Sequence, residues 1–515
     1  MLNHFNTEKK KKILVPAVTM ILGWIVYSPM CTNYFTNGDG VSCGLVYKGW
    51  SEGAEMGRIG IGFVDQFFLG RIVSPSFNLL LCLFFIGVAL IMVFSVFGIN
   101  SYLEQMLAVT LILVMPCLSS TLTYYYCMVP YMLAFLCTVA SVWIISKGRK
   151  WAVPVSAVLM MVSLTMYQAY LSVSVTMFMI WLLSLFLFDD DTRRTVIMMF
   201  QSACSTMAGV AGYLLLIKCT HVQLTESRSF DKMGQIDLGQ LDELVARAYH
   251  NFFDYFLGNE LINNSWMGRS TLNAVVLIIF IGEIIFIIRK RKIYKNIISM
   301  VFTILIICCL PLGFELIVLM APGLNTLGTT GILIVPAMVF LYLSIIIFNP
   351  VRLFSDGCIR RCVCTVWILP LVMLVWNLML FTYAFQNVMW LNYNKTMMIC
   401  QKISSTVDAR YGYEHGMKIM IAGREQDGNY PCDYEELMSI VQGTLAVKGM
   451  AWEGWLQNVC YSNIFRYYMG IYYTYPRSDE YEHIMLTEEY QKMGIFPDEN
   501  AVRMVGDTVV IKLSD

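Results

Sequence analysis

The sequence predicts a mainly α-helical, polytopic membrane protein, and three observations carry this prediction. Hydrophobic residues make up 57% of the 515 positions and charged residues only 14%, well below the roughly 25% that is usual in soluble proteins. Several uncharged runs have about 20 residues, the length that a helix needs to cross a hydrocarbon core about 30 Å thick. Short basic clusters recur between these runs. Together these features exclude an ordinary soluble enzyme, a disordered chain and a nucleic-acid-binding protein.

Reading from one charge to the next gives about 11 predicted membrane helices. They cover residues 13–31, 76–97, 106–122, 129–146, 152–166, 171–188, 195–217, 271–288, 297–319, 328–348 and 362–385. The uncharged runs 106–146 and 151–188 are each too long for one helix, so we predict hairpins that turn at residues 124–127 and 167–170. The first span follows a basic start but lacks a small-residue cleavage site, and we expect it to be retained.

The basic clusters predict the orientation of the spans, because short loops rich in Lys and Arg stay in the cytoplasm. If the N-terminus is cytoplasmic, every short basic cluster falls on that side. These clusters lie at residues 9–12, 147–150, 193–194, 289–295 and 352–361. The outer side then receives two large loops, 32–75 and 218–270, and the C-terminus.

The C-terminal part differs in composition from the rest, with mixed charges, many aromatic residues and regular turn signals. We therefore predict two parts: a transmembrane bundle with its loops at 1–385, and a small external α/β domain at 386–515. Within that domain the pattern predicts strands at 417–422 and 508–513 and helices at 393–407 and 434–443.

The loop 32–75 is the most informative part of the chain, because apolar residues alternate with charges as in short amphipathic helices at a membrane surface. Arg58 and Asp65 are seven residues apart, so a helix would place them on nearly one face. An arginine beside glycine-rich backbone suits a lipid-linked phosphate, and Asp39 can serve as a general base toward a hydroxyl. A solvated loop with surface ion pairs fits the same spacing equally well. The candidate residues in this loop are Asp39, Trp50, Glu52, Glu55, Arg58, Asp65 and Arg71.

Short motifs are spread along the chain in a definite order. They are NGDG at 37–40 with Trp50, GR at 57–58, YQAY at 167–170, and MGIFP at 493–497 followed by VVIKL at 509–513. Together these motifs resemble the integral-membrane glucosyltransferases that modify bacterial O-antigen and related surface polysaccharides.

The resemblance implies a GT-C-like helical bundle with large external loops in the cytoplasmic (inner) membrane. The donor would be a polyprenyl-phosphate sugar, with glucose expected as the sugar. The acceptor would be a cell-surface glycan on the outer face of the membrane, and the transfer would invert the configuration of the anomeric carbon. Asp39 would be the base and Arg58 would hold the phosphate, while Trp50, Tyr167 and Gln168 would line the sugar site. The donor-making synthase and a flippase are the expected partners of the same pathway.

The sequence differs from that family at the expected base. Members of the family often carry paired acidic residues followed by an arginine in this loop. Here Asp39 stands between two glycines. Glu52 and Glu55 are therefore alternative bases.

Several other ionisable groups have either a structural or a functional interpretation. We interpret the acidic run 189–191 as the cap of the next helix rather than as a metal site, since acids are favourable at a helix N-terminus. The five histidines lack zinc spacing, and no metal is expected. Glu315 lies within an apparent span, and the sequence leaves open a substrate-facing role or a buried structural hydrogen bond. Cys432 and Cys460 are candidates for a disulfide that the sequence does not decide.

Two other functions fit parts of the pattern. A transporter or flippase of lipid-linked sugars is compatible with the helix count, although the chain has no internal repeat of the kind many carriers show. A polysaccharide polymerase or ligase would use a similar donor and differ in the size of its product.

Overall fold

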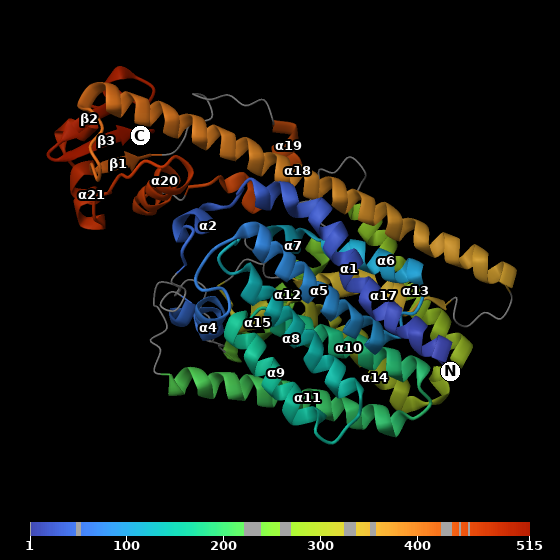
Figure 1. Ribbon diagram of the computed structural model, residues 1–515. Helices are drawn as coiled ribbons and strands as arrows, with labels where there is room; N and C mark the ends of the chain where they lie inside the picture. The colour runs from blue at the N-terminus through green and yellow to red at the C-terminus, as the bar shows by residue number, and fades with distance from the viewer. Residues whose placement is uncertain are drawn as a thin grey trace.

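The computed structural model describes residues 2–47, 53–220, 238–257, 269–323, 336–350, 357–423, 435–441, 444–451 and 454–514. The helices form an elongated bundle, and a small three-stranded sheet with short helices lies beyond one end of it (Figure 1). Helix α1 (Leu2–Thr32) begins at the opposite end, so the two termini lie far apart (Figure 1). The protein is therefore mainly helical, as the sequence predicts.

The other helices of the first half connect through short turns. They are α2 (Gly38–Cys43), α4 (Ile59–Phe67), α5 (Pro75–Phe97), α6 (Tyr102–Leu113), α7 (Pro116–Thr121), α8 (Met128–Ser146), α9 (Ala152–Met166), α10 (Tyr170–Phe188) and α11 (Thr192–Cys219). The predicted turns at 124–127 and 167–170 are confirmed, because α7 and α8 meet at the first and α9 and α10 at the second. The predicted amphipathic helices of the loop 32–75 are α2 and α4.

The second half contains the remaining helices and the sheet. The helices are α12 (Leu241–Leu257), α13 (Arg269–Arg291), α14 (Ile297–Phe314), α15 (Leu316–Met320), α17 (Val339–Ile347), α18 (Gly357–Tyr411), α19 (Glu435–Ile440), α20 (Trp455–Tyr468), α21 (Ser478–Met485) and α22 (Glu488–Gln491). The strands are β1 (Ile419–Ala422), β2 (Val502–Val505) and β3 (Thr508–Lys512).

Among the described residues, eight helices are long and apolar enough to cross a membrane. They are Leu14–Thr32 of α1, α5, α8, α10, α11, Thr271–Arg291 of α13, α14 and Ile368–Tyr411 of α18. The chain is thus a multi-pass membrane protein. Three further apolar helices, Tyr102–Leu113, Ala152–Met166 and Pro336–Ile347, are shorter, and the count of about 11 spans stays a prediction.

Two predicted spans are interrupted. The span predicted at 106–122 is two helices, since Met115 (φ −65°, ψ 133°) leaves the helical region directly before Pro116. A residue that precedes proline is disfavoured in a helix, because the proline ring clashes with its backbone. The span predicted at 297–319 likewise breaks at Glu315, between α14 and α15.

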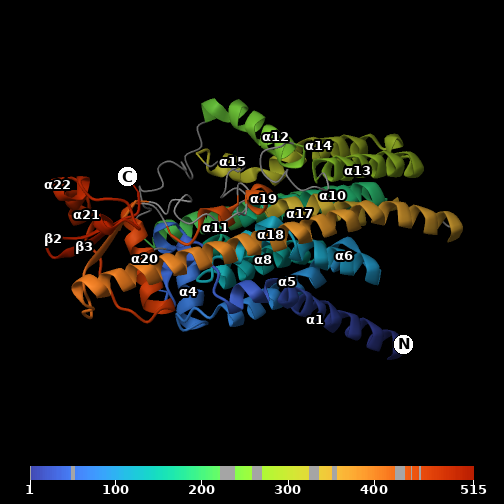
Figure 2. The ribbon, with the colours of Figure 1, turned by 90° about the horizontal axis from the view of Figure 1, so that it is seen from above.

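Helix α18 is longer than predicted. The span at 362–385 and the helix at 393–407 are parts of one helix of 55 residues. At 1.5 Å per residue it is about 80 Å long, more than twice the thickness of a hydrocarbon core. Seen from above, it runs lengthwise along the bundle to the C-terminal sheet, with α12 and α1 at opposite edges (Figure 2).

The sheet has the order β1-β3-β2, with β1 parallel and β2 antiparallel to β3. The strands predicted at 417–422 and 508–513 are therefore confirmed as β1 and β3. Their inner residues and one face of α20 form a hydrophobic cluster separate from that of the bundle. Val41 of α2, which is 1% exposed, belongs to this C-terminal cluster.

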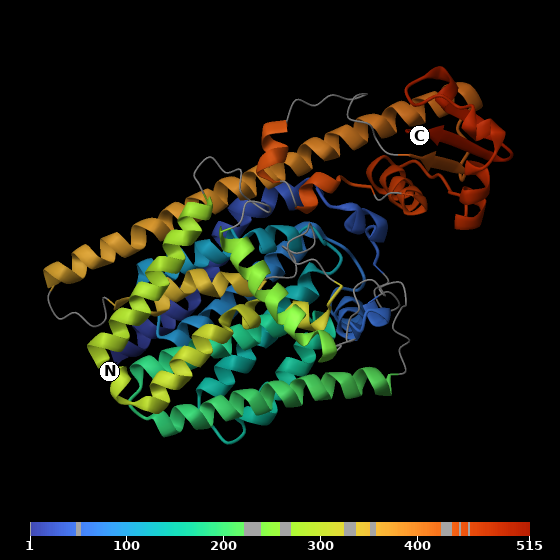
Figure 3. The same ribbon diagram turned by 180° about the vertical axis from the view of Figure 1, so that it is seen from behind.

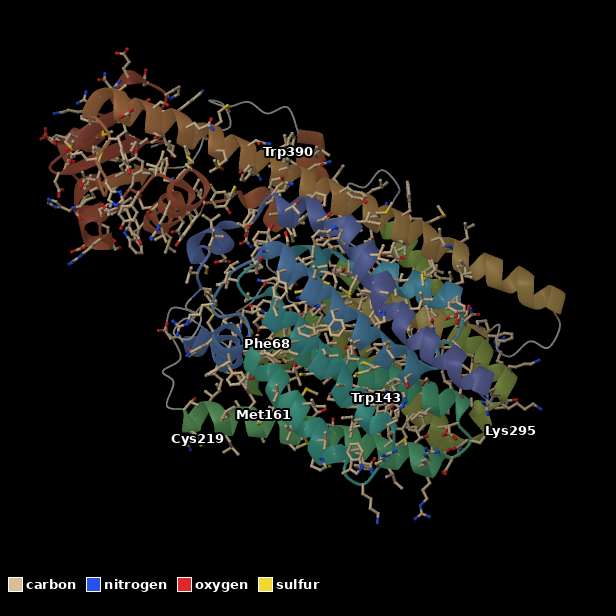
Figure 4. All side chains as sticks on the ribbon, in the orientation of Figure 1. Phe68, Trp143, Met161, Cys219, Lys295 and Trp390 are labelled. Atoms are coloured by element: carbon tan, nitrogen blue, oxygen red, sulfur yellow. The ribbon has the colours of Figure 1, made fainter. Side chains whose placement is uncertain are left out.

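The two ends of the bundle differ in their side chains. Lys295 lies at the end where α1 begins, whereas Phe68 and Cys219 lie at the end that carries α4 (Figure 4). Viewed from behind, α11 runs along the side of the bundle opposite α18 (Figure 3). Helices α2 and α4 thus lie at the end of the bundle nearer the C-terminal sheet (Figure 1).

Candidate active site

Asp39 lies half-buried in the first turn of α2, at a point where the loop is tied to the bundle. Asn37 caps α2: its Oδ1 accepts from the Gly40 amide at 2.9 Å, and its Nδ2 donates to the Thr123 hydroxyl at 3.0 Å. The Thr36 hydroxyl donates to the Thr123 carbonyl at 2.7 Å. The turn between α7 and α8 therefore fixes the start of the helix that carries Asp39.

Arg58, the N-cap residue of α4, is held by side chains of the bundle. Its Nε donates to Gln168 Oε1 at 3.1 Å and its Nη1 donates to the Tyr131 hydroxyl at 2.8 Å. The guanidinium carbon lies 5.1 Å from the ring centre of Tyr167, and that ring stacks on Tyr131 with 4.2 Å between centroids. Arg58 forms no ion pair with any residue that the structure describes.

Gln168 is the central residue of this network and is only 2% exposed. Besides accepting from Arg58, it donates from Nε2 to the Met56 carbonyl at 2.9 Å and to the Tyr213 hydroxyl at 3.0 Å. The Tyr213 hydroxyl donates in turn to the Gly57 carbonyl at 3.2 Å. Gly57 has a φ of 72°, a conformation that glycine adopts without strain. The backbone before Arg58 is thus fixed by two elements of the bundle.

Asp65 lies on α4 and is only 3% exposed. Its Oδ2 has no hydrogen-bond partner among the described residues. Burial raises the pKa of the Asp65 carboxyl to about 8, so near neutral pH it keeps its proton and can donate a hydrogen bond. Asp39, Arg58 and Asp65 all lie within electrostatic range of Cys127, at the start of α8.

The structure brings together some of the predicted site residues and not others. Tyr167 and Gln168 meet Arg58 as described above. Trp50 and Glu52 lie outside the described residues. Glu55 is exposed in a helical turn just before Arg58. Arg71 is also exposed, with a φ of 65°, and only its backbone takes part here, donating to the Asp65 carbonyl at 2.8 Å.

Glu315 has a different environment, fully buried between α14 and α15. Helix α15 packs against α10 and α12. The side chains that hold Arg58 are Gln168 and Tyr131, and Glu315 is not among its described hydrogen-bond partners, so the substrate-facing role of Glu315 remains a prediction.

Sequence reasoning missed Tyr131 and Tyr213, which hold Arg58 and the backbone before it. Both lie within long apolar helices, where a single tyrosine looks like any interfacial aromatic residue. The only signal available was their position near the helix end that faces the predicted site.

The acidic run at 189–191 acts as a helix cap, as predicted. Asp191 Oδ1 accepts from the Arg194 amide at 3.0 Å, and Asp190 pairs with Arg291 at 2.6 Å. Within the described ranges, no three His, Cys, Asp or Glu side chains are grouped to hold a metal ion. The candidate disulfide between Cys432 and Cys460 is not tested, because Cys432 lies outside the described residues; Cys460 is buried on α20.

Comparison with known families matches residues 30–348 to the family described as Glucosyl transferase GtrII. The matched part is more than half of the chain and contains α2, α4 and the turn at 167–170, but not α18 or the C-terminal sheet. No curated protein and no solved structure matches the chain. The family match agrees with the resemblance that the short motifs indicated. The chain belongs to the glucosyl transferase GtrII family.

Proposed function

We propose that this glucosyltransferase moves glucose from a polyprenyl-phosphate carrier to a hydroxyl of a cell-surface glycan, at the outer face of the cytoplasmic membrane. The family match supports the transfer of a glucosyl group, and the long apolar helices support a location in a membrane. The observation that carries the choice of donor is Arg58, a half-buried cation held by neutral side chains. A phosphate would supply a counter-charge that none of the described residues gives Arg58.

The contacts of Arg58 support a phosphate ligand. A buried charge without a counter-charge is costly, and an anionic substrate removes that cost when it binds. Nε and Nη1 are used by Gln168 and Tyr131, whereas Nη2 donates to none of the described residues. The guanidinium is therefore fixed in one orientation and keeps donors for a phosphate oxygen. Asp65, protonated near neutral pH, can add a further donor to the substrate.

An apolar pocket beside the same aromatic residues supports a lipid-linked donor. The Tyr170 ring lies edge-on to Tyr167, with 5.0 Å between centroids. Tyr170 lines a cavity of about 40 Å³ inside the bundle. The other lining residues are Ile86, Ile112, Met115, Cys117, Leu118, Thr121, Met132, Phe135, Pro336 and Val339. The cavity is smaller than one isoprene unit, so it provides apolar surroundings beside the donor phosphate rather than the path of the polyprenyl chain.

In the proposed reaction Asp39 takes the proton of the acceptor hydroxyl, and the resulting oxygen attacks the anomeric carbon. The bond from that carbon to the phosphate oxygen breaks, and its electron pair leaves with the phosphate, whose charge Arg58 stabilises. One such displacement inverts the anomeric configuration. Trp50, Tyr167 and Gln168 line the sugar, and Arg71 and Glu315 are further proposed substrate contacts. Glu52 and Glu55 are the alternative bases.

The proposed topology places the N-terminus in the cytoplasm and the C-terminus outside. It rests on the basic clusters and on the separation of Lys295 from α4 along the bundle (Figure 4). Residues 1–385 then form the membrane bundle and 386–515 the external domain, which α18 extends far enough to reach. A flippase and the synthase that makes the donor would supply the lipid-linked sugar to this face.

The test follows labelled glucose from synthetic polyprenyl-phosphate glucose in membranes that contain the wild type, Asp39→Asn or the control Asp190→Asn. We expect transfer by the wild type and the control, and a loss of about 1,000-fold in Asp39→Asn, the size usual for removal of a general base. Unchanged transfer by Asp39→Asn would move the base to Glu52 or Glu55. Absence of wild-type transfer from every hexose carrier supplied would overturn the proposed donor. The anomeric form of the product reports inversion.

A further inference from the structure

Helix α20, which lies beyond the residues matched to the family, contacts the helix that carries Asp39. Asn463 donates from Nδ2 to the Val41 carbonyl at 2.9 Å and to the Ser42 carbonyl at 2.8 Å. These carbonyls belong to the last turn of α2, whose C=O groups have no donors in a following helical turn. The Val41 carbonyl also accepts from the Gly44 amide at 3.1 Å, so Asn463 adds a second donor there and supplies one to Ser42. One side chain of the C-terminal part therefore caps the catalytic helix from outside.

Two further residues of α20 reach α2 from the same face. Cys460, Asn463 and Tyr467 are spaced i, i+3 and i+7, which places them in one row along α20. Cys460 Sγ lies 3.5 Å from the Gly38 carbonyl. The Tyr467 ring lies so close to Gly44 that a Cβ there would meet it at 2.8 Å. The row thus follows α2 from its first residue to the glycine that ends it.

Packing joins the same two helices. The Val41 side chain is 1% exposed and belongs to the hydrophobic cluster that contains Ile464 and Phe465 of α20. Arg466 lies over the rings of both Tyr467 and Tyr472, at 5.4 and 5.3 Å, and so supports Tyr467 against Gly44. The end of α2 is therefore embedded in the C-terminal part of the protein.

The start of α2 is held by a different part of the molecule, the turn of the bundle that contains Thr123. A helix of six residues is not stable in isolation. Its position, and with it the position of Asp39, depends on both attachments at once.

We infer that α20 sets the position of Asp39 for the reaction, with Asn463 as a positioning residue. The C-terminal domain is then a part of the active site rather than an accessory module. This inference rests on the proposed function, since it takes Asp39 as the base.

The test compares two asparagines of α20 in the full-length protein. Asn463 binds α2, whereas Asn458 binds only within the C-terminal part: its Oδ1 accepts from the Ile421 amide at 2.6 Å and its Nδ2 donates to the Trp455 carbonyl at 3.3 Å. Substitution of each by alanine removes the same amide group from the same helix. Transfer kinetics are measured with synthetic polyprenyl-phosphate glucose, and unfolding temperatures are measured in detergent.

For Asn463→Ala we expect kcat to fall about 10- to 100-fold, the loss that follows a misplacement of about 1 Å. KM for the donor should stay within about twofold, because Arg58 and its partners are untouched. Asn458→Ala should lower the unfolding temperature yet keep kcat below that temperature. A wild-type kcat in Asn463→Ala, or an equal loss of kcat in Asn458→Ala, would overturn the positioning role.

Two controls keep this outcome separate from the proposed function. If Asp39→Asn abolishes transfer while Asn463→Ala does not, only the positioning role fails; if the wild type transfers no sugar, the proposed function itself fails. Should Asn463→Ala not accumulate, Tyr467→Leu tests the same contact. It should lower kcat at constant KM, and an unchanged kcat would overturn the inference.

Discussion

The charged residues at the two ends of α4 lie in different environments. At the start, Arg58 has two side-chain hydrogen bonds and two tyrosine rings around it. Near the end, Asp65 is more deeply buried, and its Oδ2 has no hydrogen-bond partner among the described residues. The charge of Arg58 is therefore kept and oriented, whereas burial suppresses the charge of Asp65.

The difference shows how neighbours in the bundle give one short helix both a charged group and a neutral acid. A fixed cation attracts an anion at a defined place, and a neutral acid donates a hydrogen bond without repelling it. Both states come from neighbours in the bundle rather than from the sequence of α4 itself. The predictions below change one side of this comparison at a time.

The largest effect is expected from Arg58→Lys, which keeps the charge but removes the planar fork. The single nitrogen of an ammonium group cannot replace the separate nitrogens that bind Gln168 and Tyr131 while a third faces the phosphate. We expect kcat/KM to fall about 100- to 1,000-fold, as when one donor to a developing negative charge is lost. Steady-state transfer assays measure this. Arg149→Lys, at the opposite end of the bundle, is the control, and an equal loss there would contradict the assignment.

A smaller effect, on stability, is expected from Asp65→Asn. Below about pH 4 the wild-type carboxyl is neutral in both states, because its ordinary pKa is 3.8 and its folded pKa is about 8. As pH rises from about 4 to about 8, the unfolded chain loses the proton that the folded protein keeps, so the wild type loses stability. The variant lacks this dependence. Because the folded pKa lies so far above the ordinary value, the variant should gain several kcal/mol of stability relative to the wild type between about pH 4 and about pH 8.

Thermal unfolding in detergent between about pH 4 and about pH 9 measures this difference. The stability difference between the two proteins should be smallest near the ordinary pKa of 3.8, should widen up to about pH 8, and should then stay constant. Parallel pH profiles would mean that Asp65 is ionised in the folded protein and has a partner that compensates its charge.

Local patterns predicted much of the fold. Uncharged runs marked the helices, and aromatic turns at 124–127 and 167–170 separated the hairpins. Local chemistry also explains the break at Met115, since Pro116 was visible in the sequence. What the runs did not reveal was that α18 continues unbroken through Gln386, whose amide donates to the Val26 carbonyl of α1 at 2.8 Å.

The site was predicted less completely than the fold. Arg58, Tyr167 and Gln168 stood out because they belong to the short motifs GR and YQAY, which lie between the predicted spans. Tyr131 and Asn463 did not, because their roles exist only when distant segments meet. Contacts between distant segments leave no local pattern in a single sequence. The contact between α2 and α20 is one of them.

The smallest effect is expected from Gly60→Ala, which tests whether the close contact of α4 with α9 holds Arg58 and Asp65 together. A Cβ at Gly60 would lie 2.5 Å from the Thr165 hydroxyl and 3.0 Å from the Thr165 carbonyl, so α4 must shift. We expect a destabilisation of about 1–2 kcal/mol in thermal unfolding, as for an overpacked core. Gly282→Ala is the matched control: its Cβ meets nothing within 4 Å, and alanine should stabilise that helix slightly. If both variants gain stability, α4 is free to move on α9, and the orientation of Arg58 must then come from Gln168 and the tyrosines without help from this contact.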